Sequence, residues 1–351
     1  MDDSGNQHVR RQRYKGTHPK HFDQKYKELN PEKYGDTIQK VLQKGSTPAG
    51  MHRSICVDEI LDFLDLQPGQ VGVDCTLGYG GHTLEMLKKL NGTGHVFGLD
   101  VDPIESVKTK DRLQEFGYGE ERFTLIVTNF QEIGAIAKER GPFDFILADL
   151  GVSSMQIDNP HRGFSYKLDG PLDLRMNPQK GEPASNRLFE MTMDEIEGML
   201  LENADETYAH EIAEAISKEQ RKGIKIDTTT KLRELIQQTL SFLPEQTKKE
   251  EIKKACQRSF QAMRIDVNHE LDSLFLFLDQ IPECLKPGGK VAILTFHSGE
   301  DRLVKKAFKH FHQLGVYEMI SPAPIRPSAE ECHANPRATS AKLRFAIKKQ
   351  S

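Results

Sequence analysis

The 351-residue chain has no tryptophan, only five cysteines and no long hydrophobic run. The cysteines contain no Cys-x-x-Cys pair, which argues against a zinc knuckle and favours free thiols in a reducing cytoplasm. Cys332 and His333 are adjacent but lack companions at ligand spacing, so we predict no metal site. No stretch approaches the roughly 18 apolar residues of a transmembrane helix, and the chain starts with acidic residues rather than a hydrophobic signal. We therefore expect no membrane partner.

The chain also has no excess of positive charge, and its net charge of −4 argues against a uniformly basic nucleic-acid binder. The charge is unevenly distributed, since residues 1–53 carry eleven Lys or Arg and six Asp or Glu. A basic arm on an acidic body can be an RNA-binding tail or a solvated extension. We predict a basic N-terminal extension over residues 1–50, and the sequence leaves both functions open.

Short apolar segments at residues 71–77, 95–102, 122–130 and 143–151 alternate with segments of helical periodicity. Such alternation is typical of a parallel sheet covered by helices on both faces. Right-handed crossovers then make the sheet doubly wound. The sequence therefore predicts an α/β fold.

The alternation stops after residue 151 and returns only at residues 290–296. Turn residues crowd residues 158–182, and purely helical patterns follow, one of them opened by the capping box Thr192-x-x-Glu195. We predict an all-helical insertion after the fourth strand. The predicted divisions are the extension at 1–50, a first α/β part at 51–157, the insertion at 158–262 and a second α/β part at 263–351.

The segment VGVDCTLGYGGHTLEML, residues 71–87, reads as a strand, a glycine-rich loop and a helix, which is a common ligand-binding unit. Asp74, Gly78, Gly80 and Gly81 follow the first strand, and Asp100 ends the second, where a carboxylate accepts hydrogen bonds from two ribose hydroxyls. The loop lacks the third glycine of the dinucleotide fingerprint. Because an anion such as Asp74 suits the methionine ammonium, we favour S-adenosylmethionine over a dinucleotide, with a ligand-free glycine turn as a third interpretation.

Side chains at the carboxyl ends of the later strands are further candidates, since ligands of open α/β sheets bind at that edge. Asp149 ends the fourth predicted strand, and Gln156 follows seven residues later. His297 follows the fifth strand, and structural and catalytic roles remain open for it.

Six segments carry a resemblance to a known family. They are DCTLGYGGH, GLDVDP, ADLGVSSMQIDNPHRGFSYKLDGPLDLRMNP, FQAMRIDVNHELD, LKPGGKVAILTFHSGEDR and ANPRATSAKLR, in this order. From about residue 51 to the end, the chain resembles the small-subunit (16S) ribosomal RNA cytosine-N4 methyltransferases of the MraW family.

The resemblance implies a class I S-adenosylmethionine-dependent methyltransferase fold, Rossmann-like, with a helical insertion that recognises the substrate. It implies methylation of the exocyclic N4 of a cytidine in 16S rRNA, with the small ribosomal subunit as partner and S-adenosylmethionine as cofactor. It places cofactor contacts at Gly80, Gly81, His82, Asp100, Phe130, Asp149 and Gln156. Tyr79 and Gly299 depart from the family pattern, which usually has glycine and leucine there. A homodimer is left open.

Cytosine N4 is a poor nucleophile because its lone pair is delocalised into the ring. An acceptor for the N4–H would localise that lone pair, and Asp149 is our candidate, although Asp149 serving the cofactor alone remains an alternative. Ser153, Ser154 and His297 are predicted to hold the base edge, and the base must leave its stack to reach them. The predicted RNA contacts are Arg162, Arg175, Lys254, Arg258, Arg337 and Lys342.

Other functions remain open at this stage. A methyltransferase of the same fold could act on another RNA position or on a substrate other than RNA. A non-catalytic ribosome-assembly factor could retain the fold, and Tyr79 in the glycine loop would permit that reading. A solvated basic helix is the alternative to RNA contacts at Lys254 and Arg258.

Overall fold

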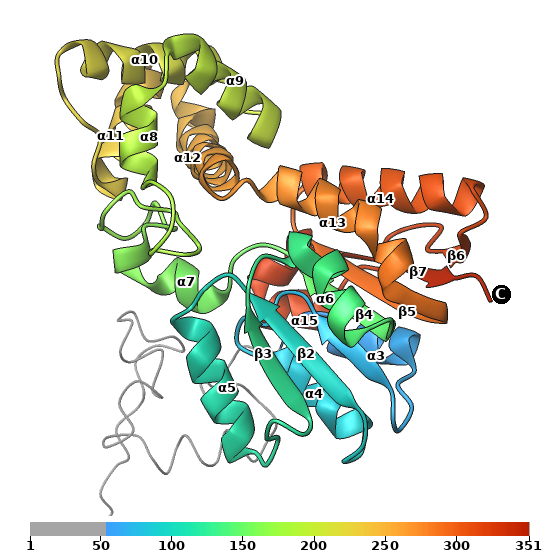
Figure 1. Cartoon of the computed structure of the whole chain (residues 1–351). Coiled ribbons are helices and arrows are strands. Elements are labelled where there is room, and N and C mark those ends of the chain that lie inside the picture. The colour runs from blue at the N-terminus through green and yellow to red at the C-terminus, as the bar shows by residue number, and fades with distance from the viewer. Residues whose placement is uncertain (1–53, 351) are drawn as a thin grey trace, which may run out of the picture. The chain divides into compact units, whose positions relative to one another are not determined.

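A seven-stranded sheet forms the centre of the computed structural model, which describes residues 54–350 (Figure 1). The strand order is β3-β2-β1-β4-β5-β7-β6, and β7 is antiparallel to both of its neighbours. The strands are β1 (Val71–Asp74), β2 (His95–Asp100), β3 (Phe123–Val127), β4 (Phe143–Asp149), β5 (Leu285–Thr295), β6 (Tyr317–Ile320) and β7 (Lys342–Lys348). The four predicted strands before the insertion are all present and parallel, so the prediction of a doubly wound sheet is confirmed.

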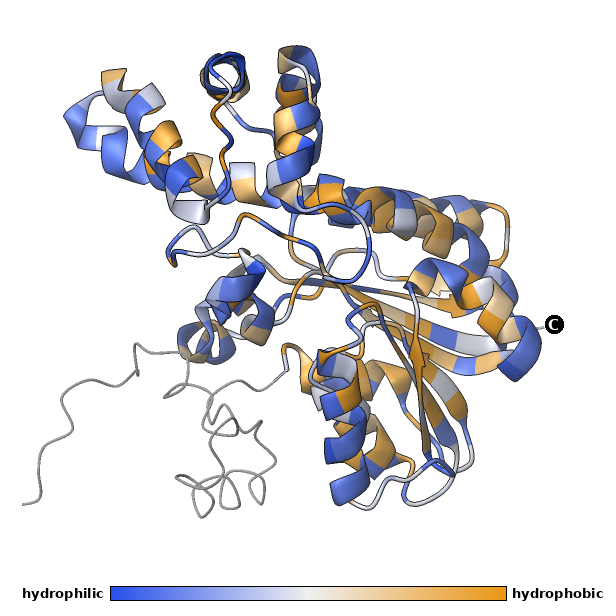
Figure 2. Ribbon diagram, turned by 60° about the vertical axis from the view of Figure 1, so that its left-hand side comes forward, coloured by the Kyte–Doolittle hydropathy of each residue, from blue (hydrophilic) through white to orange (hydrophobic). Residues whose placement is uncertain are grey.

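Helices cover both faces of this sheet. The helices of the α/β part are α3 (Val57–Leu64), α4 (Gly81–Lys89), α5 (Glu105–Glu115), α6 (Ile133–Arg140), α13 (Glu270–Cys284) and α14 (Ser298–Gln313). One buried core contains Ile146 of β4 with residues of α6, α13 and α14, whereas a second contains Phe145 and Leu147 with residues of α3, α4 and α5. Successive β4 residues therefore point to opposite, fully covered faces, as a central parallel strand requires. Figure 2 shows the apolar residues gathered along the strands.

The insertion has its own core. The helices that follow β4 and precede α13 are α7 (Ser154–Asp158), α8 (Ala184–Glu190), α9 (Met193–Ala204), α10 (Ala209–Arg221), α11 (Thr229–Thr239) and α12 (Glu245–Asn268). The predicted capping box is present, because Thr192 caps α9 and the Glu195 carboxylate accepts the N–H of Thr192. Helix α12 crosses the predicted boundary at 262/263, so the last turn of this helix belongs with the insertion by packing.

Two elements of the sheet differ from the sequence prediction. Strand β5 begins at Leu285, and the predicted Pro287-Gly288-Gly289 turn forms an irregularity within it, between the pairs Phe143–Leu285 and Phe145–Lys290. Strand β6 was not predicted, because it has only four residues at the sheet edge and shows no clear alternation of buried and exposed positions. The predicted basic extension lies outside the described residues. Within the described range, even the longest helix, α12, is too polar to cross a bilayer, and no other helix could do so.

Candidate active site

The carboxyl ends of β1, β2, β4 and β5 bring the predicted acidic and histidine residues to one edge of the sheet. Asp74 and Asp100 end β1 and β2, and Asp149 ends the neighbouring β4. The backbone N–H of Asp149 donates to Thr76 Oγ1 at 2.6 Å, which ties the end of β4 to the glycine loop. His297 follows β5 and precedes α14. The edge therefore carries residues from four strands, as predicted for a ligand crevice.

The glycine loop folds against Asp100. Gly78 and Gly80 have φ angles of +48° and +73°, which glycine adopts at little cost. The N–H groups of Gly78 and Asp102 donate to the two Asp100 oxygens at 2.7 and 2.8 Å. Burial nevertheless raises the pKa of Asp100 to about 6, because it outweighs these two hydrogen bonds. Each Asp100 oxygen keeps a second lone pair for a ligand hydroxyl.

Asp74 holds the loop to the following helix. Its two oxygens accept hydrogen bonds from the Thr76 N–H at 3.1 Å and the Thr83 hydroxyl at 2.6 Å. The side chain is almost fully buried, and burial raises its pKa. These contacts show a structural role for Asp74 that the sequence analysis did not foresee.

Tyr79 packs against α5. The Arg112 guanidinium carbon lies 3.6 Å from the Tyr79 ring centroid, and Arg112 also donates to the Tyr79 carbonyl. A cation over an aromatic face is attracted by the ring quadrupole. This contact gives the departure from the family pattern a partner on α5.

His82 and Asp149 face each other across the end of the sheet. His82 Nε2 lies 3.4 Å from Asp149 Oδ2, and the His82 side chain is 7% exposed. Burial alone would lower the pKa of His82, but the contact with Asp149 and the charges of Asp149 and Asp74 together raise it. The pair therefore favours an imidazolium beside a carboxylate at this point.

His297 belongs to a buried charged cluster that joins β5 to α12 and α13. Its Nε2 lies 3.1 Å from Glu300 Oε1, while Glu300 Oε2 accepts the N–H of Phe296 at 2.7 Å. Arg264 of α12 forms a bidentate pair with Glu270 of α13, at 2.8 and 2.9 Å. Burial would raise the pKa of Glu300, but His297, the Phe296 N–H and Arg264 together lower it.

Gly299 lies under the ring of His297. A Cβ at position 299 would come within 3.1 Å of His297 Nδ1 and 3.2 Å of Cε1. The glycine thus leaves room for the present position of the imidazole, where a larger side chain would press on it.

Asp102 is a site residue that the sequence analysis missed. Its Oδ2 accepts Gln156 Nε2 at 3.0 Å and Arg162 Nη1 at 2.7 Å, and it is 1% exposed. Arg162 also donates to the carbonyls of Arg175 and Met176. The second acid of the Asp-x-Asp pair after β2 was the available signal. Asp102 thereby fixes Gln156 and anchors the loop that follows β4.

The remaining predicted residues near the crevice have local partners. Ser153 caps α7, where Gln156 Oε1 accepts the Ser153 N–H at 2.9 Å, and Ser154 is the first residue of that helix. Phe130 begins a 3-10 turn after β3, and its ring packs edge-on against Phe277 at 5.1 Å between centroids. Phe130 thus lies just after the carboxyl end of β3.

All six predicted RNA-binding cations have acidic partners. The pairs are Arg162–Asp102, Arg175–Asp173, Lys254–Glu251, Arg258–Glu206, Arg337–Asp158 and Lys342–Asp301. Arg258 is bidentate to Glu206, whose side chain is 0% exposed, so it neutralises a buried charge. Reversing the charge of Arg258 would therefore test folding rather than RNA binding. Lys254 is more exposed and pairs only within its own helix.

Unsatisfied buried atoms concentrate in the predicted site. Within residues 54–350, seven buried side-chain nitrogen or oxygen atoms have no hydrogen-bond partner. Five of them belong to His82, Asp149, His297 and Arg337, which contribute Nε2, Oδ1, both ring nitrogens and Nη1 respectively. Both Nε2 atoms lie in ion pairs, with Asp149 and Glu300, so the atoms of the predicted site for which a ligand would supply a partner are Asp149 Oδ1 and His297 Nδ1.

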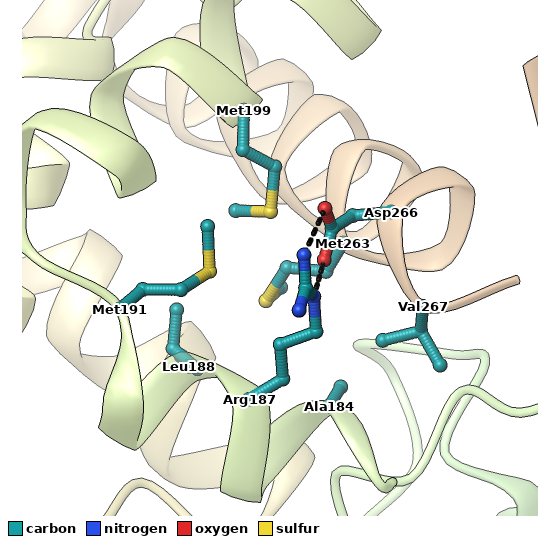
Figure 3. A pocket seen from close by; sticks show the side chains of 8 residues that line it. All are labelled: Ala184, Arg187, Leu188, Met191, Met199, Met263, Asp266 and Val267. Atoms are coloured by element: carbon teal, nitrogen blue, oxygen red, sulfur yellow. Dashed lines mark hydrogen bonds and ion pairs between the residues drawn. The ribbon is translucent and has the colours of Figure 1, made fainter. Parts of the chain in front are cut away.

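A second concavity lies in the insertion, between α8, α9 and α12 (Figure 3). Met191, Met199 and Met263 point into it, and the Arg187–Asp266 ion pair crosses its rim. It leaves no room for a water molecule. We therefore interpret it as the packed seam of the insertion core rather than as a ligand site.

Comparisons with known proteins agree with the architecture. The model of the MraW methylase family matches residues 49–349. The ribosomal RNA small subunit methyltransferase H 1 of Lachnoclostridium phytofermentans is 62% identical over 97% of this chain and 93% of its own length. The corresponding H 2 protein of Alkaliphilus metalliredigens is 60% identical over 99% and 100%. The H protein of Heliobacterium modesticaldum is 38% identical over 85% of this chain but 98% of its own length, so that relative is shorter.

Proposed function

Because the chain belongs to the MraW methylase family, we propose that it methylates the exocyclic N4 of a cytidine in 16S rRNA. The methyl donor is S-adenosylmethionine, and the fold is the class I methyltransferase fold that the sequence predicted. The substrate partner is the small ribosomal subunit or its RNA, which places the enzyme in the cytoplasm. The relatives named as small-subunit rRNA methyltransferases support this reaction.

The observation that carries the proposal is that two buried atoms, Asp149 Oδ1 and His297 Nδ1, have no hydrogen-bond partner at the carboxyl ends of β4 and β5. These atoms combine hydrogen-bond donors and acceptors, as needed for a ligand that is polar on several sides. The Asp100 oxygens, each with a free lone pair, fit the two hydroxyls of a ribose. The residues present therefore fit S-adenosylmethionine.

We assign the cofactor to the edge formed by β1, β2 and β4. The residues that would hold it are Asp74, Gly78, Gly80, Gly81, His82, Asp100, Phe130, Asp149 and Gln156. Asp100 would accept the ribose hydroxyls, and Asp102 would keep Gln156 in place for its contact. Asp74 would contribute chiefly through its negative charge, because its oxygens already hold Thr76 and Thr83.

Bound S-adenosylmethionine supplies an electrophilic methyl group for an in-line displacement. Asp149 Oδ1 would accept the N4–H of the cytosine and localise the amine lone pair, since this buried oxygen has no other partner among the described residues. His297, Ser153 and Ser154 would hold the base edge. No strong base is needed, because the methylated nitrogen loses its proton readily. The catalytic contribution of the protein is thus positioning and exclusion of water.

We assign substrate recognition to the insertion, residues 158–262 together with the last turn of α12. Of the six cations predicted for RNA, Lys254 has the most exposed side chain, and its ion pair lies within its own helix. A non-catalytic role loses its main support, because the Tyr79 ring is held by Arg112 of α5.

The test is transfer of tritiated methyl from S-adenosylmethionine to small ribosomal subunits that lack the modification, followed by nuclease digestion and nucleoside analysis. Labelled N4-methylcytidine is the expected product. The Asp149→Ala variant is the matched inactive control. Label in another nucleoside would overturn the assignment of N4 as the methylated atom. Absence of label despite measurable cofactor binding would overturn the assignment of small-subunit RNA as the substrate.

A further inference from the structure

Helix α14 carries a stripe of exposed cations. Arg302, Lys305, Lys306 and Lys309 are all exposed, and each lies three or four residues from two of the others. Residues at these spacings share one helix face. The opposite face carries Val304 and Phe308, which are buried in the core beneath the sheet. The packing of α14 therefore turns these four cations, the α14 stripe, toward solvent.

The α14 stripe has no paired acid among residues 54–350. No ion pair is formed by any of its four cations with a carboxylate in the described part of the chain. The last acid of the helix is Asp301, which is already held by Lys342 and Arg344. From residue 302 to residue 313 the sequence contains no Asp or Glu.

Several other helices of this protein pair lysines with acids of the same helix. Six lysines pair with an acid three residues earlier, namely Lys88, Lys108, Lys222, Lys248, Lys253 and Lys254. A solvated helix of the usual kind would carry the same alternation of sign. The uninterrupted charge of α14 is thus a local exception on a chain whose net charge is −4.

The stripe begins beside the candidate active site. Helix α14 starts at Ser298, directly after His297, so Arg302 lies about one turn from the carboxyl edge of the sheet. From Arg302 to Lys309 the helix rises about 10 Å, which suits successive phosphates of one nucleic-acid strand. A strand entering the crevice would meet these cations as it passes over α14.

We propose that the α14 stripe binds the phosphate backbone of the RNA that flanks the target cytidine. The proposal rests on the proposed function, because it assigns the surface that guides RNA to that site. Phosphate contacts of this kind position the strand without reading its sequence. The main electrostatic contact with RNA is then made by the α14 stripe, because the cations of the insertion are already paired.

The test compares Arg302→Gln/Lys306→Gln/Lys309→Gln with a control triple, Lys89→Gln/Lys138→Gln/Lys349→Gln. The control lysines are also exposed and form no ion pair with any described residue, but Lys89 and Lys138 lie in the last turns of α4 and α6, and Lys349 directly follows β7. Glutamine preserves helix propensity, so both triples should fold. The probe is an rRNA fragment from the small subunit, titrated at several salt concentrations.

The α14 triple is expected to lower RNA affinity about tenfold or more near 0.1 M salt and to reduce the slope of log affinity against log salt by about 2. Cofactor affinity and kcat at saturating substrate should be unchanged. Equal affinity and slope in the two triples would overturn the α14 proposal while wild-type methyl transfer stands. Absence of wild-type methyl transfer would overturn the proposed function, whereas the binding comparison would still decide the role of α14.

Discussion

Asp149 connects the end of β4 to the glycine loop and to His82. Its N–H binds Thr76 in the glycine loop, one oxygen faces His82, and the other oxygen is buried without a partner in the described structure. A carboxylate in this position can serve the nucleophile, the cofactor or both. The two roles make different kinetic predictions.

If Asp149 accepts the N4–H, Asp149→Ala should lower kcat about a hundredfold while the dissociation constant for S-adenosylmethionine stays within about threefold. Asp149→Asn, which keeps one carbonyl oxygen, should fall between Asp149→Ala and the wild type. Single-turnover methyl transfer and calorimetric cofactor titration measure the two quantities separately. A large loss of cofactor affinity with kcat preserved would instead assign Asp149 to the cofactor alone.

The raised pKa of Asp100, about 6, predicts a pH-dependent cofactor affinity. Ribose hydroxyls donate to the ionised carboxylate, so binding requires loss of the proton below pH 6. Affinity should be level above pH 7 and fall about tenfold between pH 7 and pH 5. Titration of S-adenosylhomocysteine by calorimetry checks this. In Asp100→Asn the affinity should be weak at every pH, and an unchanged profile in that variant would refute the assignment.

The raised pKa of Asp100 has the opposite effect on the pH dependence of folding stability. Because the buried Asp100 prefers its protonated form in the cofactor-free protein, its ionisation opposes folding as the pH rises from the ordinary value of 3.8 through about 6. Its contribution to stability is therefore greatest in acid and lost toward neutral pH, where the cofactor would compensate for it.

At the scale of elements, helix α12 links the two parts of the molecule. Arg258 neutralises the buried Glu206 between α9 and α10, and Arg264 pairs with Glu270 at the start of α13. Both pairs join helices rather than offering charge to a partner. The helix therefore contributes to RNA recognition mainly by holding the insertion in place.

Removing Arg258 should leave Glu206 as an unpaired buried charge. Arg258→Met is expected to lower the free energy of unfolding by about 3 kcal/mol. The double variant Arg258→Met/Glu206→Gln should recover much of this loss, since no charge then remains buried. Urea unfolding monitored by circular dichroism measures both values. Lys254→Gln is the control, and it should change stability by less than about 0.5 kcal/mol because its pair is exposed.

Local patterns predicted most elements correctly but not their long-range partners. The alternation of strands and helices and the capping box at Thr192 are local signals, and both are present in the structure. Strand β6 gave too short a signal, and the contact of Asp102 with Arg162 joins residues 60 positions apart. A cation that appears free in the sequence can thus be neutralised by a distant acid. For this reason, only the structure showed that the predicted cations are paired and that the cations of the α14 stripe are not.

At the scale of the whole molecule, the basic extension precedes the region that matches the family model. The family model begins at residue 49, and the shorter Heliobacterium relative spans only 85% of this chain. Residues 1–53 nevertheless hold eleven of the positive charges, against six negative ones. The extension therefore carries an excess of positive charge but none of the proposed catalytic residues.

A chain lacking residues 1–48 should bind S-adenosylmethionine with unchanged affinity and methylate at an unchanged kcat. Its KM for small subunits should rise several-fold, and the increase should shrink at high salt because it reflects screened charge. Steady-state methyl transfer at two salt concentrations measures this. A loss of cofactor binding would show instead that the extension completes the active site.

The unsatisfied atoms of Asp149 and His297 also bear on how this protein would respond to selection for heat resistance. Each such atom costs about 1–3 kcal/mol when no ligand is present. Apolar replacements of similar shape at these positions would relieve that cost. A screen that rewards only survival at high temperature would therefore enrich inactive variants at the site, whereas a screen with cofactor present would not.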